Sequence, residues 1–176
     1  PLRDVMVLAM HTGARLENLL EIEQVDADGS GFRVLSGKTD AAVRWVPVVH
    51  PEAVEVLLRR RRQFPEGSIF GDATISKATG ERSTPMSKRF GKLRRKVLPE
   101  VPDGELVLHC ARHTWRTAAL RAEVSDSATR QLGGWIDEGR DTSSPYNHGL
   151  TRDQLREAME QIVGWMVSEG YIKAAR

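Results

Sequence analysis

Residues 11–20 read HTGARLENLL, and this stretch puts an arginine at the junction of two predicted helices. Residues 2–10 are apolar at most positions and the pattern stops at Gly13, which is typical of a buried helix that ends at a glycine. A helical pattern resumes over residues 15–23, with its leucines mostly on one face. Arg15 should therefore open the second helix, directly after a turn. Its planar guanidinium group suits phosphate oxygens, although such an arginine, taken alone, is more often an exposed cap residue.

Outward from this stretch, the sequence predicts a mainly helical protein with one small sheet. Two valine-rich segments, 32–36 and 42–49, are typical of antiparallel strands, and the turn sequence at 37–40 joins them. Further helices are expected to begin at Pro51 and after the capping residue Thr84, to cover residues 112–121 and 126–132, and to follow the capping residue Thr151.

The composition fits one soluble globular domain. The 176 residues are 40% hydrophobic and 28% charged, which is ordinary for a chain long enough to bury a core. The single cysteine, Cys110, excludes a disulfide scaffold and a cysteine-rich zinc site. No stretch is apolar enough to span a membrane and no signal peptide is visible, so a cytoplasmic location is expected.

Positive charge is concentrated in two runs. The net charge is only +2, but residues 59–62 are consecutive arginines and residues 88–96 hold six of the lysines and arginines. Either run alone is more often a solvated helix face. Two such runs in one small domain favour a surface that contacts the phosphate backbone of a nucleic acid.

A second tract, HCARHTW at residues 109–115, holds an imidazole and a guanidinium group three residues apart. On a helix, His109 and Arg112 would share a face. The imidazole could hold or take a proton at a reacting oxygen, and the guanidinium group could neutralise developing negative charge. His113 is expected to be a packed, hydrogen-bonded neighbour of this pair. The pattern His-x-x-Arg alone occurs often by chance.

Two other residues have both a structural and a functional interpretation. Lys38 lies in the turn of the predicted hairpin, where most lysines are simply solvated, but its flexible stem suits delivery of a proton to a site. Trp135 follows Gly133 and Gly134, where an ordinary core tryptophan is nearly as good an interpretation as an indole that donates its N–H to a phosphate.

Tyr146 is the candidate nucleophile, in the polar loop 136–149. The chain has two tyrosines, and the other, Tyr171, lies near the C-terminus. A phenol with a pKa of about 10 is a poor nucleophile at neutral pH unless cationic groups and a base surround it. The two tracts described above could supply such groups.

The order and spacing of these residues resemble the catalytic domain of the tyrosine recombinases, the phage-integrase family, over nearly the whole chain. Residues 12–15 match the family's Thr-Gly-x-Arg, and residues 109–114 match its His-x-x-Arg-His-Thr. The chain departs from the family at Asn18, where an acidic residue is usual, and at Cys110 and Ala111. The matching site positions, in family order, are Arg15, Lys38, His109, Arg112, Trp135 and Tyr146.

This resemblance implies an α+β, mainly helical fold, a helix bundle with a small antiparallel sheet, and a single catalytic domain over residues 1–176. It implies site-specific cleavage and rejoining of DNA strands through a 3′-phosphotyrosyl intermediate, with Tyr146 as the nucleophile and Lys38 as the proton donor to the leaving 5′ oxygen. No cofactor and no metal are expected. The class of activity would be DNA integration and recombination, as in bacterial, phage or other mobile elements.

The implied partner is double-stranded DNA, with no membrane association. Family members usually carry a helical core-binding domain before this one, which we expect to be absent from this chain, and they assemble into dimers and tetramers on DNA. The predicted C-terminal helix, residues 151–169, could mediate this assembly, because its apolar stripe must be covered in the same chain or on a neighbour. We expect this region to be mobile or exchanged between copies without DNA. The stripe consists of Leu155, Met159, Ile162, Val163 and Met166.

Two other activities fit the same residues. A type IB topoisomerase would use related chemistry but rejoin the original strand. A degenerate, non-catalytic DNA-binding remnant is also compatible with Asn18 and Cys110, although six retained site positions argue against it.

Overall fold

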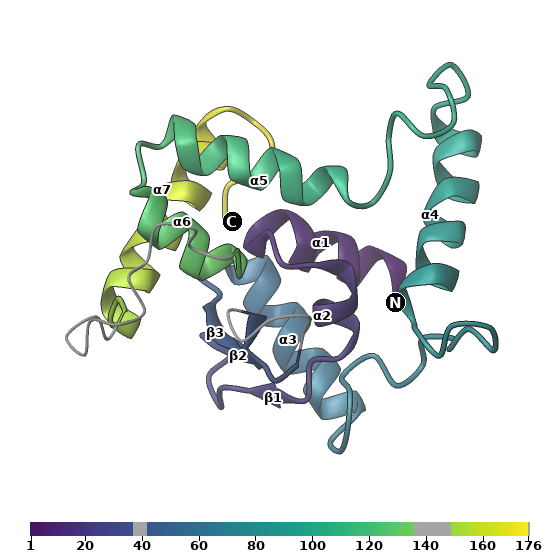
Figure 1. Cartoon of the computed structure of the whole chain (residues 1–176), viewed down its shortest axis with the longest axis horizontal. Coiled ribbons are helices and arrows are strands. Elements are labelled where there is room, and N and C mark those ends of the chain that lie inside the picture. The colour runs from purple at the N-terminus through teal and green to yellow at the C-terminus, as the bar shows by residue number, and fades with distance from the viewer. Residues whose placement is uncertain (37–41, 136–148, 176) are drawn as a thin grey trace.

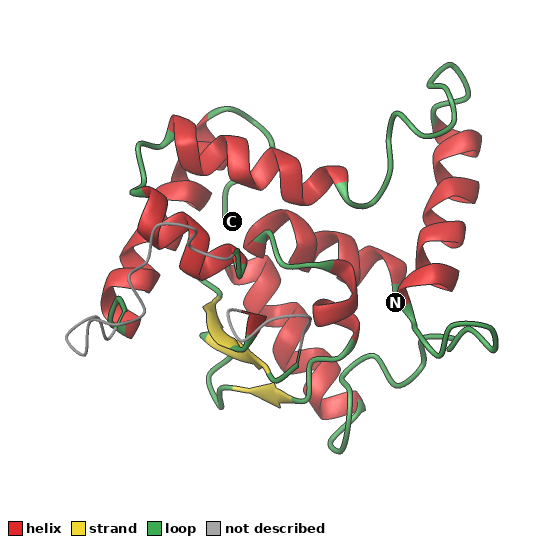
Figure 2. Cartoon of the chain, in the orientation of Figure 1, coloured by secondary structure: helices red, strands yellow, loops and turns green. Residues whose placement is uncertain are grey.

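The computed structural model describes residues 1–36, 42–135 and 149–175, and it is mainly helical with one small antiparallel sheet, as predicted (Figures 1 and 2). The sheet has the strand order β1-β2-β3, with Phe32 of β2 opposite Val46 of β3. The elements are α1 (Leu2–Thr12), α2 (Leu16–Leu20), β1 (Gln24–Val25), β2 (Gly31–Val34), β3 (Arg44–Pro47), α3 (Pro51–Gln63), α4 (Ser83–Val97), α5 (Cys110–Arg121), α6 (Asp126–Gly133) and α7 (Arg152–Ser168).

Helix α1 is the centre of the fold. It packs against α2, α3 and α5, and Figure 1 shows it between α5 on one side and α3 with the sheet on the other. Val5 and Leu8 of α1 are completely buried, as is Trp115 of α5. Burying these side chains is the main stabilising contribution to the core. The residues that follow α1 therefore lie between α5 on one side and α3 with the sheet on the other.

The predicted hairpin is present but shorter than expected. The second strand, predicted over 42–49, is β3, and the short strand β1 was not predicted. The turn at 37–40, and with it Lys38, lies outside the described residues.

Helix α7 packs as part of the core, with its apolar stripe turned toward the rest of the chain. All five residues of its predicted stripe, from Leu155 to Met166, are buried in the same chain, where α7 packs against α5, α6 and β3. Thr151 opens the helix with the expected side-chain cap, and Gln154 completes a capping box. The stripe is therefore covered within this chain, and self-association through the C-terminal helix stays a prediction.

The arginine run 59–62 does not form the expected phosphate-contacting surface. Arg60 is only 2% exposed, and its guanidinium group lies 2.7 Å from a carboxylate oxygen of Asp4 and 2.9 Å from one of Asp72. Arg59 pairs with the other oxygen of Asp4 at 2.6 Å, and Arg61 donates to backbone carbonyl oxygens. The cause is the packing of α3 on α1, which places Asp4 beside the run.

Helix α4 carries the second basic run on a more exposed surface, and Figure 1 shows it to one side of the other helices. Arg94 is the exception, because it is buried and pairs with Asp103. The apolar side of α4, which includes Leu93 and Val97, is only partly covered and lines a cavity of about 320 Å³ toward α1 and α5. The exposed cations are Lys88, Arg89, Lys92, Arg95 and Lys96. In the described part of the chain, every helix is too short or too polar to cross a membrane.

Candidate active site

The α1–α2 junction positions Arg15. Gly13 ends α1 in the left-handed conformation, with φ 62°, and the next residues lead to Arg15 at the N-terminus of α2. A Cβ atom on Gly13 would lie 2.4 Å from the Trp115 ring, so both the backbone angle and the close packing require glycine. The Oγ of Thr12 donates to the Leu8 carbonyl and accepts a bond from Ala14 N–H, which fixes the turn further. Arg15 itself is half-exposed.

Arg112 joins this turn to the Gly133-Gly134 segment. It is 5% exposed, and its Nη1 donates to the Gly13 carbonyl oxygen at 2.7 Å while its Nη2 donates to the Gly133 carbonyl oxygen at 2.8 Å. Both carbonyls lie at helix C-termini, where the helix dipole favours a positive charge. The guanidinium group is therefore held in one orientation by main-chain atoms of two segments that are far apart in the sequence.

Trp135 covers this guanidinium group. The Arg112 Cζ lies 4.0 Å from the centre of the Trp135 ring, a close cation–π contact, and Arg116 lies over the same ring at 5.2 Å. Trp135 also stacks on Trp115, with ring centres 6.3 Å apart. Gly133 leaves the space for the indole, because a Cβ there would overlap the ring. Trp135 is thus neither a fully buried core residue nor a free surface residue.

Arg44 lies in the same cluster, although it is not among the site residues predicted from the sequence. It opens β3, its Nε donates to the Leu132 carbonyl oxygen at 2.7 Å, and its Nη1 donates to the Ala42 carbonyl oxygen at 2.8 Å. Its Nη2 is buried and has no partner among the described residues. In the sequence, Arg44 is an arginine within a valine-rich predicted strand. Such a residue is explained by the strand pattern alone, so nothing in the sequence indicated that Arg44 would lie beside Arg15 and Arg112.

These arginines form a cluster of unneutralised positive charge. Burial lowers the pKa of Arg112 to about 9, with further contributions from the charges of Arg15, Arg44 and Arg116. Burial and Arg15 likewise lower the pKa of Arg44 to about 10. No carboxylate in the described part of the chain forms an ion pair with Arg15, Arg44 or Arg112. The three guanidinium groups are charged at neutral pH and repel one another. A bound anion would therefore stabilise them.

His109 lies at the edge of this cluster, immediately before α5. It is exposed, and its ring meets that of His113 edge-on with centres 4.9 Å apart. Partial burial lowers its pKa, as do the charges of His113, Arg112 and Arg15. A largely neutral imidazole at pH 7 can accept a proton. His113 is exposed rather than packed, so the expectation of a packed neighbour is wrong.

Asn18 stands where the family resemblance would predict an acidic residue, and Glu17 is one position earlier. Each of them forms hydrogen bonds with another segment of the chain. Asn18 is buried, and its Nδ2 donates to the Ser36 carbonyl oxygen at 3.4 Å. The Glu17 carboxylate accepts bonds from the backbone N–H groups of Arg82 and Ser83, at 3.1 and 2.8 Å, where α4 begins. Glu17 therefore caps the basic helix from a position two residues after Arg15.

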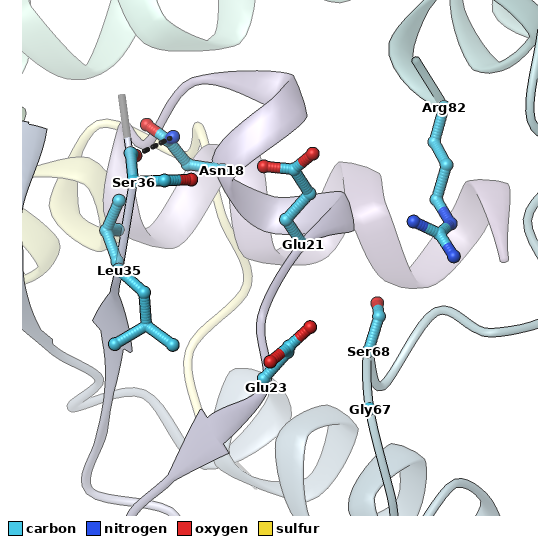
Figure 3. Close-up of a pocket in the computed structure, with 9 residues that line it drawn as sticks. Asn18, Glu21, Glu23, Leu35, Ser36, Gly67, Ser68 and Arg82 are labelled. Carbon is cyan, nitrogen blue, oxygen red and sulfur yellow. Dashed lines mark hydrogen bonds between the residues drawn. The ribbon is translucent and has the colours of Figure 1, made fainter. Parts of the chain in front are cut away.

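Beside Asn18 lies an open cavity of about 500 Å³ (Figure 3). Glu21 follows the last residue of α2, Glu23 precedes β1 and Arg82 precedes α4, and all three line this cavity. Burial and the neighbouring Glu17 raise the pKa of Glu21. This cavity is acidic on one side, so it is a poor site for a phosphate.

Four of the six predicted site residues are described, and they converge. Arg15, His109, Arg112 and Trp135 come from the α1–α2 junction, the two ends of the first turn of α5, and the segment after α6. Lys38 and Tyr146 lie outside the described residues.

Comparison with solved structures finds the same fold in an integrase from mycobacterium phage Brujita. The two structures align with a TM-score of 0.61 and 20% sequence identity, over 92% of this chain. This chain spans about half of that integrase, 51% of its length. No family model and no curated protein sequence matches the chain. The similarity therefore establishes an integrase-like fold.

Proposed function

We propose that this chain is the catalytic domain of a tyrosine-type DNA recombinase, which cuts and rejoins DNA strands at specific sites. The observation that carries this proposal is the fixed orientation of Arg112 between the Gly13 and Gly133 carbonyls, beside Arg15 and Arg44 and without a described carboxylate partner. Such a group of preorganised donors suits the charge that develops on a phosphodiester during its cleavage. The integrase-like fold supports the same assignment.

In the proposed reaction, the Tyr146 oxygen attacks the phosphorus atom and the bond from phosphorus to the 5′ oxygen breaks. His109 takes the tyrosine proton, and Lys38 gives a proton to the leaving 5′ oxygen. Arg15 and Arg112 bind the non-bridging oxygens, and Trp135 holds Arg112 in place. A 5′-hydroxyl of a second DNA end then attacks the phosphotyrosine and releases Tyr146. The phosphodiester energy is kept in the protein–DNA bond, so this sequence needs no metal and no nucleotide cofactor.

Double-stranded DNA is the proposed partner, and α4 is the proposed contact surface. Its exposed cations include Lys88, Lys92 and Lys96, which lie at i, i+4 and i+8 and so form one ridge. Glu17 fixes the start of this helix near Arg15. We further propose that residues 1–176 act as one part of a larger DNA clamp, and that the protein self-associates on DNA through its C-terminal helix.

A nicked DNA substrate tests the proposal directly. Tyr146→Phe removes only the proposed nucleophilic oxygen, so it should abolish the SDS-resistant protein–DNA adduct and leave DNA binding nearly intact. Tyr171→Phe is the matched control, because Tyr171 stacks on Trp165 at the C-terminal end of α7. An adduct formed by Tyr146→Phe would remove Tyr146 from the role of nucleophile.

Assays with two DNA substrates distinguish a recombinase from a type IB topoisomerase and from a non-catalytic DNA-binding remnant. A type IB topoisomerase would relax supercoiled plasmid without exchanging ends, whereas a recombinase should join a labelled 5′-hydroxyl strand from a second duplex. A non-catalytic remnant would bind DNA and form no adduct with either substrate.

A further inference from the structure

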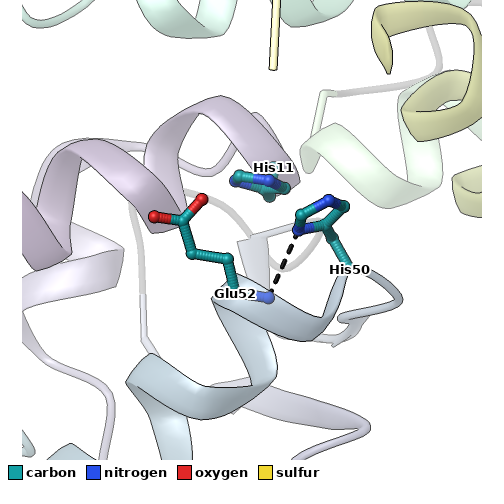
Figure 4. Close-up of side chains that lie close together, drawn as sticks. All are labelled: His11, His50 and Glu52. Carbon is teal, nitrogen blue, oxygen red and sulfur yellow. Dashed lines mark hydrogen bonds between the residues drawn. The ribbon is translucent and has the colours of Figure 1, made fainter. Parts of the chain in front are cut away.

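Two histidines and a glutamate that play no part in the proposed reaction come together where α1 meets α3 (Figure 4). His11 lies in the last turn of α1, His50 precedes α3, and Glu52 lies in its first turn. One possible ligand atom from each residue lies within 4.8 Å of the others. The two imidazole rings are 4.5 Å apart, and the histidines are only 4% and 6% exposed. Buried polar side chains normally have hydrogen-bond partners, so two buried histidines beside a glutamate need a physical explanation.

The hydrogen bonds leave one unprotonated nitrogen on each histidine. The Nδ1 of His11 lies 2.8 Å from the Val7 carbonyl oxygen, and the Nε2 of His50 lies 2.9 Å from the Lys173 carbonyl oxygen. A carbonyl oxygen can only accept, so these ring nitrogens carry the protons. The lone pairs are then on the Nε2 of His11 and the Nδ1 of His50. The Nε2 of His11 is buried and has no partner among the described residues.

This arrangement is the one that a metal-binding histidine usually has. Such a residue donates one ring N–H to a backbone carbonyl or carboxylate, which fixes its tautomer and directs the other nitrogen at the metal. Glu52 supplies an anionic oxygen within 4.8 Å of a ring nitrogen of each histidine, and Figure 4 shows its side chain beside the two rings.

We propose that His11, His50 and Glu52 bind a divalent transition metal ion of the zinc type, with water as the fourth ligand. Two imidazole nitrogens and one carboxylate oxygen are a common ligand set for zinc at a site that keeps an open position. The unpartnered nitrogen of His11 would then have a partner, which removes the free-energy cost of burying it unsatisfied.

Two existing interactions compete with the metal, and both are weak. The Nδ1 of His50 accepts a 3.3 Å hydrogen bond from Glu52 N–H, which caps α3. The Glu52 carboxylate pairs at 3.5 Å with Arg3, whose side chain is 86% exposed. A metal would replace the first bond and draw Glu52 away from the second. Coordination bonds are stronger than either interaction, so the exchange favours the bound state.

A metal here would stabilise the fold rather than take part in the reaction. It would join α1, α3 and the C-terminal segment, which is already attached to His50 through Lys173. None of the three ligands contacts Arg15, Arg112 or Trp135 in the described hydrogen bonds and ring contacts. This inference is therefore independent of the proposed recombinase activity.

Zinc chloride titrated into the metal-free 176-residue chain tests the proposal, by calorimetry for affinity and by thermal unfolding for stability. One zinc ion per chain should bind and raise Tm by roughly 5–10 °C when zinc is at about a hundred times its Kd. Cobalt(II) should give the intense visible absorption of a tetrahedral site. His11→Gln and His50→Asn should each weaken zinc binding at least about a hundredfold, and Glu52→Gln at least about tenfold.

The choice of variants separates metal binding from folding. Asparagine is a good helix cap, so His50→Asn removes a ligand and keeps α3 capped. His113→Gln and Cys110→Ser are controls, since either residue could bind zinc adventitiously near the surface. Unchanged binding in both controls supports the proposal. Absence of stoichiometric binding, loss of binding in His113→Gln, or full binding in a folded His50→Asn protein would each overturn it.

Discussion

Arg112 has five N–H donors, and its two terminal nitrogens each already donate to a main-chain carbonyl oxygen, those of Gly13 and Gly133. The remaining N–H groups can bind a ligand without any reorientation of the side chain. The Trp135 ring over the guanidinium plane prevents rotation out of this position. At this scale the site depends on orientation as much as on charge, and lysine cannot reproduce the same fork of donors.

Arg112→Lys should therefore reduce the rate of covalent capture of nicked DNA by about a hundred- to thousandfold, because removal of one preorganised donor at a reacting group typically lowers the rate by that factor. DNA binding should change little, since the charge is retained. Arg116→Lys is the matched control, because Arg116 contacts the same indole ring but is exposed. Equal losses in the two variants would show that the Trp135 contact, and not Arg112, sets the rate.

Arg44 provides a second test at the residue scale. Arg44→Gln removes a charge beside Arg15 and Arg112, so it should lower the affinity for inorganic sulfate, measured by Trp fluorescence, by about tenfold or more. Arg33→Gln is the control, because it removes an exposed charge from the neighbouring strand β2. Equal sulfate affinity in wild type and Arg44→Gln would assign Arg44 a purely structural role at the Leu132 carbonyl.

At the scale of elements, the two basic runs have opposite roles although they look alike in the sequence. On α3, three of the four arginines already pair with Asp4, Asp72 or backbone carbonyl groups. On α4, most of the cations are exposed. The difference arises from packing, since α3 lies against α1 and α4 has few neighbours. Glu17 adds a constraint of its own, because its carboxylate caps α4 and so connects the basic helix to the Arg15 turn.

The α4 ridge should dominate the electrostatic part of DNA binding. Replacing Lys88, Lys92 and Lys96 together by glutamine should reduce the slope of log K against log salt by up to about 2.7, since each phosphate contact contributes about 0.9. Arg62→Gln, on the exposed end of α3, should leave the slope unchanged. A slope unaffected by the triple substitution would make this ridge a solvated helix face.

Residue patterns predicted those elements and site positions that depend on local sequence. Gly13 ends a helix and the capping residue Thr151 begins one where expected. The convergence of four site residues followed from the family resemblance. Arg44 and the paired arginines of α3 could not be predicted, because their partners, Leu132 O and Asp4, are distant in the sequence and become neighbours only through packing.

At the scale of the whole molecule, α7 completes the core. Its buried stripe packs on α5 and α6, the two helices that carry or precede Arg112 and Trp135. The C-terminal segment continues to His50, where Lys173 accepts a hydrogen bond. The end of the chain is thus attached both to the site helices and to the start of α3.

Met159→Ala should consequently destabilise the whole protein. Met159 is completely buried, and truncation of such a side chain costs about 2–5 kcal/mol, which corresponds to a fall in Tm of roughly 5–15 °C. Glu160→Ala, which removes an exposed pairing with Arg156, should change Tm little. An unchanged Tm for Met159→Ala, together with weaker self-association, would instead indicate that the α7 stripe itself docks on a neighbour.

The main-chain anchoring of Arg112 has a consequence for how this protein can diverge. A carbonyl oxygen is present whichever amino acid occupies the position, so substitutions cannot delete the two acceptors that orient the guanidinium group. A carboxylate anchor, in contrast, is lost by a single substitution. The two glycines are the exception to this tolerance, Gly13 because of its φ of 62° and the Trp115 ring, and Gly133 because of the Trp135 ring. Genetic drift can therefore replace most of the surrounding sequence before the arginine loses its support.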